Sequence, residues 1–206
     1  NRAARTTCVK PAGTTSLVLG TSSGIHAWHN DYYIRRLRVG KNEAIYNYLA
    51  KQHPELVQDE YFRPHDTAVI EIPQSAPKGS ILRTESAFDL LERVKKVATE
   101  WVQPGHRAGN NTHNVSATIS LKQEDWDKAG EWMWKNRDCY NGLSVLPYDG
   151  GTYTQAPFED IKKSEFDKLV KSLHDVDITK VKEMTDETDL SGELACAGGS
   201  CEITGL

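Results

Sequence analysis

The sequence shows no long hydrophobic run, no recognisable secretory signal and no cysteine framework. Its apolar runs are only a few residues long, whereas a membrane-spanning helix needs about 20 apolar residues, so we expect no membrane span. No charged and then apolar leader opens the sequence, so no secretory signal is expected. Four cysteines without a framework pattern fit a reducing compartment, and we expect a cytoplasmic protein. The net charge of −4 argues against nucleic acid as a main partner.

The composition is that of an ordinary globular chain. Its 206 residues are 38% hydrophobic and 26% charged, enough to bury one core. The first residue is Asn1 rather than Met, and the sequence runs at once into what reads as the middle of a fold. We therefore expect a fragment of a longer chain. A mature protein left after processing is the alternative.

Hydrophobic periodicity predicts alternating strands and helices. Residues 85–101 have apolar positions at helical spacing, and residues 43–52 and 166–173 also read as helical, the last behind a predicted cap at Ser164. Another helix is predicted after a capping box of Ser120 and Gln123. Buried strands are predicted over residues 15–19 and 143–146, an extended segment over 32–39, a strand over 67–72 ended by Pro73, and a half-buried strand over 115–121. This alternation indicates the α/β class.

Two cysteines close to the end of the chain are the most informative feature. Cys196 and Cys201 are separated by Ala-Gly-Gly-Ser, and the two glycines permit the tight backbone that a small disulfide ring requires. A structural disulfide and half of a zinc site are the alternatives, although no nearby Cys or His pair completes four ligands. Residues 183–193 are acidic and poor in large apolar side chains, which predicts a flexible tether. A tether that carries a dithiol favours a thiol shuttle, so we expect a folded part over residues 1–182 and a redox tail over 183–206.

A second informative segment reads Lys-Pro-Ala-Gly-Thr-Thr-Ser over residues 10–16. Its glycine lets backbone N–H groups approach an anion, and three successive hydroxyls offer further donors to phosphate oxygens. The Walker arrangement is absent, and the alternative is a plain turn that enters a buried strand. The candidate phosphate-binding residues are Pro11, Ala12, Gly13, Thr14, Thr15 and Ser16.

Isolated candidates carry less weight because they lack partners in the sequence. His26 and His29 read as packing and surface histidines rather than ligands. The arginines within residues 35–38 could clamp an anion, although a charge cluster is more often a solvated face. Cys8 and Cys139 are lone cysteines, which we expect to be buried and inert.

Several of these segments, in this order, resemble a ribonucleotide reductase. The likeness is to the carboxy-terminal part of the catalytic chain and covers essentially all 206 residues. The sequence is most similar to the adenosylcobalamin-dependent class II enzymes, especially the monomeric type that acts on ribonucleoside triphosphates. The segments that carry the resemblance are residues 6–16, 20–26, 32–36, 141–147 and the terminal Cys-x4-Cys.

The resemblance implies a fold, a reaction and roles for particular residues. The family fold is a ten-stranded α/β barrel, of which this chain would supply later strands, helices and the flexible tail. The reaction converts ribonucleotides to 2′-deoxyribonucleotides by radical chemistry that adenosylcobalamin begins. The family's Pro-x-Gly-Thr-x-Ser loop holds the substrate phosphates, a role that falls on residues 11–16. The tail dithiol, here Cys196 and Cys201, re-reduces the active site and is itself reduced by thioredoxin or a glutaredoxin-like protein.

The sequence departs from the family at the catalytic centre. The Asn-x-Cys-x-Glu pattern that carries the radical does not occur, and Cys8 and Cys139 lie in the wrong contexts to replace it. The allosteric nucleotide site is also missing, so this chain alone is not expected to catalyse the reaction without the amino-terminal part.

Two alternatives remain at this point. One is a class I large subunit, which uses a separate radical-generating subunit. The other is a stand-alone thiol-redox or regulatory protein, whose apolar faces would close into a core of their own. A fragment of a reductase would instead expose a large apolar surface.

Overall fold

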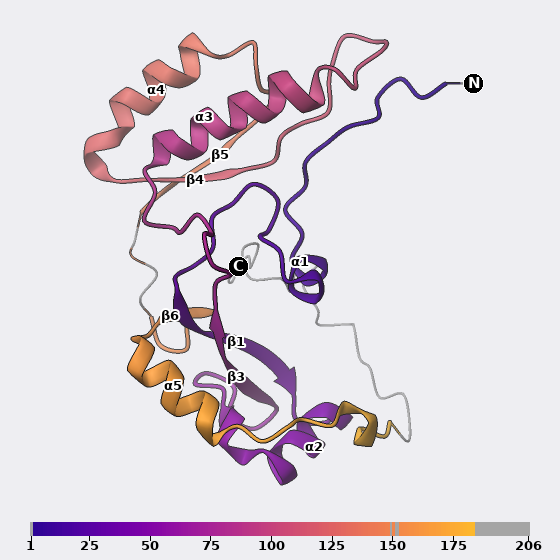
Figure 1. Ribbon diagram of the computed structural model, residues 1–206, viewed down its shortest axis with the longest axis vertical. Coiled ribbons are helices and arrows are strands. Elements are labelled where there is room, and N and C mark those ends of the chain that lie inside the picture. Colours follow the sequence, from indigo (N-terminus) through magenta and orange to yellow (C-terminus); the bar gives the residue numbers. More distant parts are fainter. Residues whose placement is uncertain (1, 149, 151–152, 184–206) are drawn as a thin grey trace. The chain divides into compact units, whose positions relative to one another are not determined.

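The computed structural model describes residues 2–148, 150 and 153–183, and the chain divides into two units (Figure 1). Among the described residues, unit 1 contains 2–28 together with 79–148 and 150, and unit 2 contains 29–78 together with 153–183. Each unit has its own cluster of buried apolar residues. Among the described residues, every helix is too short or too polar to cross a lipid bilayer.

Unit 1 combines three α-helices with a pair of parallel strands. Strands β4 and β5 are paired in parallel, from Thr118 opposite Ser144 to Leu121 opposite Pro147. Figure 1 shows α3 lying along these strands. The elements are α1 (Thr14–Leu19), α3 (Ala87–Val97), a π-helical turn (Ala98–Val102), β4 (Thr118–Leu121), a 3-10 turn (Gln123–Asp125), α4 (Trp126–Lys135) and β5 (Ser144–Pro147).

Helix α3 confirms the predicted helix and anchors the core of unit 1. It begins at a capping box, in which the side chains of Ser86 and Asp89 each accept a backbone N–H of the other. Its buried side continues into the π-helical turn through Val94, Ala98 and Val102, all of which are at most 4% exposed. The spacing of four along this stripe turns Trp101 outward, which leaves it 55% exposed. Leu91 of the same helix shares this core with Val115, Ile119 and Leu121.

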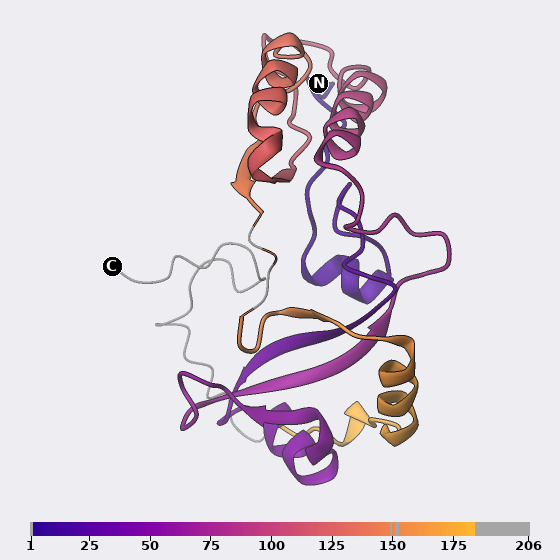
Figure 2. The same ribbon diagram turned by 90° about the vertical axis from the view of Figure 1, so that its left-hand side faces the viewer.

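Unit 2 is built on a four-stranded antiparallel sheet in the order β2-β3-β1-β6. The long pair β1 and β3 forms the centre of the sheet. Helices α2 and α5 pack against the sheet (Figure 2). The elements are β1 (Tyr32–Gly40), α2 (Ala44–Gln52), a 3-10 turn (Pro54–Leu56), β2 (Val57–Asp59), β3 (Thr67–Ser75), β6 (Phe158–Asp160), α5 (Lys163–Ser172) and a second 3-10 turn (Ile178–Lys180). The core residues are Val39, Leu49, Leu56, Ala68 and Ile70.

The predicted buried strand over residues 15–19 is wrong, because these residues form helix α1. Gly20 ends the helix in a left-handed conformation with φ 60°, and its N–H reaches back toward the carbonyls of Ser16 and Leu17. Val18 is 80% exposed and Leu19 is 67% exposed, so the apolar run does not enter the core. A short apolar run has no periodicity that distinguishes a strand from a helical turn.

Several predicted boundaries also differ from the structure. β3 continues through Pro73 to Ser75, because β2 pairs only with Ala68–Ile70 and leaves that side of β3 open, where a proline is tolerated. The predicted capping box at Ser120 is wrong, since Ser120 lies within β4. Helix α5 has Lys162 rather than Ser164 at its N-cap. The strand near residues 143–146 exists as β5, but it is mostly exposed rather than buried.

The coarse prediction of a mixed α/β protein is confirmed, although the larger sheet is antiparallel. Helices α2, α3 and α5 lie close to where hydrophobic periodicity placed them. The ten-stranded barrel and the boundary between residues 182 and 183 stay predictions.

Candidate functional site

Of the predicted phosphate-binding residues, 11–13 lead into α1 and 14–16 form its first turn, and we refer to the whole stretch as the loop of residues 11–16. Gly13 occupies the N-cap position with helical φ and ψ of −69° and −77°. Ser16 is only 6% exposed. Its hydroxyl lies 2.9 Å from the carbonyl oxygen of Gly13 and also contacts the carbonyl oxygen of Ala12. A hydroxyl has one proton to donate, and that of Ser16 is used in these bonds to the backbone of residues 12 and 13.

The outer side of this loop is open. A Cβ atom added to Gly13 would meet no atom within 4 Å, and Thr15 is exposed. The structure therefore leaves open space beside Gly13 and exposes Thr15 to solvent.

The next segment, residues 22–26, lies directly against this loop. Gly24 has a φ of +59°, and a Cβ atom there would lie 3.2 Å from Cα of Pro11 and 3.3 Å from the carbonyl oxygen of Lys10. These are backbone atoms, which cannot move aside as the end of a flexible side chain can. We call residues 22–26 the brace, because their backbone limits how far residues 11–16 can move toward them.

His26 fastens the brace to the core strand β4. The N–H of Thr118 donates to Nε2 of His26 at 3.0 Å, so Nε2 carries no proton. Nδ1 then carries the proton and donates to the carbonyl oxygen of Ser23 at 2.9 Å. Both ring nitrogens are used within the protein. His26 is therefore a packing residue, as the sequence predicts, but one with a specific attachment that the sequence does not show.

Arg93 fastens the same segment to α3. Its guanidinium donates to the carbonyl oxygen of Ile25 at 3.0 Å and to one carboxylate oxygen of Glu85 at 3.0 Å, with a second bond to the other oxygen. The hydrogen bond to Glu85 raises the pKa of Arg93 above its ordinary value. Bidentate binding to Glu85 holds the guanidinium of Arg93 in one orientation, so the carbonyl of Ile25 has a fixed hydrogen-bond donor.

Three segments that carry the family resemblance meet in unit 1. Besides the loop and the brace, the segment at residues 141–147 contacts residues 112–114. Asn141 donates to the carbonyl oxygen of Thr112 at 2.8 Å, and Asn114 donates to that of Gly142 at 3.1 Å. The carbonyl oxygen of Asn114 in turn accepts the N–H of Val9 at 3.4 Å. The structure thus gathers residues that are scattered along the sequence.

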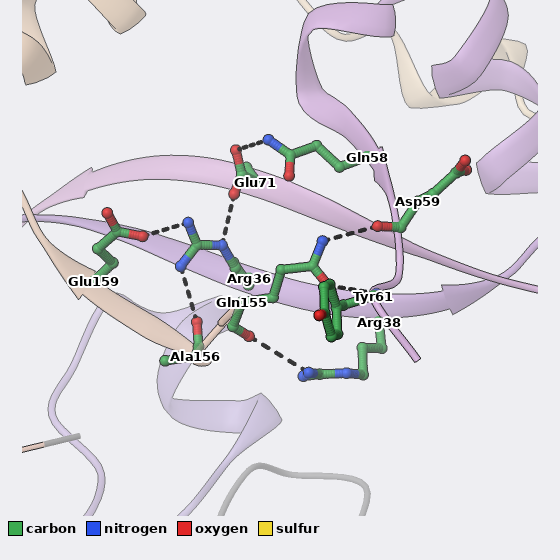
Figure 3. A network of polar contacts seen from close by, with 9 residues as sticks. All are labelled: Arg36, Arg38, Gln58, Asp59, Tyr61, Glu71, Gln155, Ala156 and Glu159. Carbon is green, nitrogen blue, oxygen red and sulfur yellow. Dashed lines mark hydrogen bonds and ion pairs between the residues drawn. The ribbon is translucent and has the colours of Figure 1, made fainter. Parts of the chain in front are cut away.

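The fourth segment, residues 32–36, belongs to unit 2 and lies on β1. Figure 3 shows that Arg36 donates to Glu71 at 2.6 Å and also to Glu159. Arg38 lies 3.5 Å from Glu60, whose side chain is only 7% exposed. Carboxylates therefore neutralise both arginines, and these two do not form an anion clamp.

The predicted redox cysteines, Cys196 and Cys201, lie outside the described residues. Cys8 is exposed, so its predicted burial is wrong, whereas Cys139 is half-buried. Burial raises the pKa of the Cys139 thiol, which favours the protonated form that does not attack disulfides.

Comparisons with known proteins agree with the resemblance. The chain is 28% identical over 207 residues to an adenosylcobalamin-dependent ribonucleoside-triphosphate reductase of Lactobacillus gasseri, covering 98% of this chain and 27% of that protein. It is 28% identical over 203 residues to the enzyme of that name from Euglena gracilis, covering 95% and 26%. A probable enzyme of this kind from Dictyostelium discoideum is 29% identical over 209 residues, covering 96% and 25%. No protein-family model matches the chain.

A solved structure shares the fold. A crystal structure of a B12-dependent (class II) ribonucleotide reductase superposes with a TM-score of 0.63 at 23% identity, over 79% of this chain and 22% of that one. The chain spans about a quarter of the length of the curated relatives that it matches. Over almost all of its residues, the chain resembles the catalytic chain of the adenosylcobalamin-dependent, class II ribonucleotide reductases, and the resemblance inferred from its motifs is confirmed.

Proposed function

We propose that this chain is part of a ribonucleotide reductase that converts ribonucleoside triphosphates to 2′-deoxyribonucleotides by radical chemistry. The observation that carries the proposal is the 28% identity to a reductase of that name over 98% of the chain. Because the chain spans about a quarter of that relative, the activity belongs to a longer protein that also contains the radical-bearing cysteine. The four cysteines without a framework pattern support a cytoplasmic location.

In this proposal, residues 11–16 hold the substrate phosphates. The open space beside Gly13 and the exposed Thr15 support this role, because phosphate oxygens need closely approaching N–H and O–H donors. Ser16 contributes by shape, since its hydroxyl bonds the carbonyl oxygens of Ala12 and Gly13.

Cys196 and Cys201 act as the electron shuttle. Each turnover oxidises a pair of active-site thiols to a disulfide while the ribose is reduced. A thiolate of the tail pair attacks that disulfide, and the second tail thiol completes the exchange, which leaves two active-site thiols and a tail disulfide. Thioredoxin or a glutaredoxin-like protein then reduces the tail disulfide by a second exchange of the same kind.

Adenosylcobalamin supplies the initiating radical in this proposal. Within the part of the chain that the structure describes, the cavity of unit 2 lined by Ile34, Leu56, Pro73 and Leu173 has a volume of about 30 Å³, so this cavity has room for about one or two waters and not for a corrin ring. We assign cofactor binding to the remainder of the longer protein.

The test is reduction of a ribonucleoside triphosphate by the complete chain that contains this sequence. Activity should require adenosylcobalamin, and activity without it would contradict the class II assignment. Replacing both tail cysteines (Cys196→Ser and Cys201→Ser) should abolish turnover with thioredoxin and spare turnover with dithiothreitol, because the small dithiol reaches the active site directly. Cys139→Ser is the control and should leave both activities unchanged. Equal loss with both reductants would contradict the shuttle.

A further inference from the structure

The contact between Gly24 and Pro11 suggests how the loop of residues 11–16 is held in place. Pro11 has a φ fixed by its ring, so a push on its backbone cannot be absorbed by rotation at that bond. Ser16 ties the carbonyls of Ala12 and Gly13 to α1, so residues 12–16 move with Pro11. Any displacement of the brace at Gly24 is therefore passed to Thr15.

The brace is itself held from the opposite side. His26 accepts the N–H of Thr118 in β4 at 3.0 Å, and Arg93 of α3 donates to the carbonyl of Ile25 at 3.0 Å. Both anchors belong to elements whose side chains form the core of unit 1. A continuous chain of contacts thus runs from the core, through His26 and Gly24, to the backbone of Pro11.

We propose that Gly24 and His26 are positioning residues for the substrate triphosphate: the brace sets the position of residues 11–16, and neutral His26 sets the position of the brace. This inference rests on the proposed phosphate-binding role of that loop. In this proposal both residues act through Pro11 and the loop rather than by direct contact with the phosphates.

The chain offers a matched control for Gly24. Gly20 and Gly24 have almost the same backbone, with φ of +60° and +59°, so an alanine at either position meets similar backbone strain. A Cβ at Gly20 would meet nothing within 4 Å, whereas a Cβ at Gly24 would meet Pro11 at 3.2 Å. The difference between Gly24→Ala and Gly20→Ala therefore isolates the contact with the loop.

A second matched pair isolates the anchor of His26. Gln places an amide oxygen near the position of Nε2 and can accept the N–H of Thr118. Asn is shorter and reaches only as far as Nδ1, so it can contact Ser23 but not Thr118. If the link to Thr118 positions the brace, then His26→Gln preserves substrate binding and His26→Asn does not.

The experiment measures KM and kcat for a ribonucleoside triphosphate in the complete reductase, together with the dissociation constant of the nucleotide by equilibrium dialysis. We expect Gly24→Ala and His26→Asn to raise both KM and the dissociation constant at least tenfold with a smaller change in kcat. Gly20→Ala and His26→Gln should stay within threefold of the unchanged protein. Thermal unfolding of each variant shows whether it is folded at the assay temperature. If Gly24→Ala is not folded there, the His26 pair decides.

Equal effects of Gly24→Ala and Gly20→Ala would overturn the inference, because strain rather than contact would then be responsible. Equal KM values for His26→Gln and His26→Asn would overturn it as well. Thr15→Ala separates this inference from the proposed function. A raised KM in Thr15→Ala without one in Gly24→Ala or His26→Asn overturns the inference alone. An unchanged KM in Thr15→Ala overturns the phosphate-binding role, and the inference with it.

Discussion

Replacing Arg93 with methionine should destabilise unit 1 markedly. Methionine keeps much of the apolar length of arginine but has no charge and no donors, so two acceptors lose their partner. These are the carboxylate of Glu85, whose side chain is 12% exposed, and the carbonyl oxygen of Ile25.

The size of the effect follows from burial. Removing one partner of a fully buried ion pair costs about 3–5 kcal/mol, because the other charge is left buried and unpaired. The Arg93 side chain is 22% exposed and that of Glu85 is 12% exposed, so water recovers part of that cost, and about 2 kcal/mol remains. The lost bond to Ile25 adds about 1 kcal/mol. We expect Arg93→Met to lower the free energy of unfolding by about 2–3 kcal/mol.

Urea unfolding followed by tryptophan fluorescence is a suitable assay, because all five tryptophans lie in unit 1. Lys96→Met is the control: it removes a cation from an exposed position of the same helix and should change stability by less than about 0.5 kcal/mol. Glu85→Gln in the Arg93→Met background should recover about 1 kcal/mol, since no unpaired charge is then buried. An effect of Arg93→Met below about 0.5 kcal/mol, or strict additivity in the double variant, would show that the Arg93–Glu85 pair does not stabilise unit 1.

Two further predictions concern one carboxylate in each unit. Hydrogen bonds from the Ser86 hydroxyl and then the Ser86 N–H lower the pKa of Asp89 below 3.8, so its contribution to stability is present above about pH 4 and is lost as pH falls through the lowered pKa. The stability gap between Asp89→Asn and the unchanged protein, measured by urea unfolding, should therefore shrink between pH 7 and pH 3, and a constant gap would count against the capping box. In unit 2, Glu60 accepts the N–H groups of Phe62 and Arg63, both at 2.7 Å. Glu60→Gln should speed hydrogen exchange at these two amides about tenfold, through the loss of about 1.4 kcal/mol, and unchanged exchange would show that the carboxylate does not hold this turn.

The spacing of apolar residues was sufficient to predict an element where the residues of that element alone determine its structure. The apolar spacing of residues 85–101 predicted α3, and the extended segment over residues 32–39 predicted β1, because both signals are complete within the element. The motif segments likewise indicated the family, because a short motif depends on residue order alone.

Contacts between residues that are distant in the chain could not be predicted from local sequence patterns. The apolar run at residues 15–19 has no periodicity, and its helical form depends on the left-handed cap at Gly20. Arg36 could have met any carboxylate, and only the register of β1 with β3 and β6 brings it to Glu71 and Glu159.

Local sequence was enough to predict helices α2, α3 and α5, the central strands and the family resemblance, since each depends on residues close together in the chain. Long-range packing, in contrast, places Gly24 against Pro11 and brings the N–H of Thr118 to His26. The reason is that a glycine with a positive φ and a neutral histidine are compatible with many loops. How closely a second backbone approaches Gly24, where an added Cβ would lie 3.2 Å from Cα of Pro11, is set by how the whole of unit 1 packs.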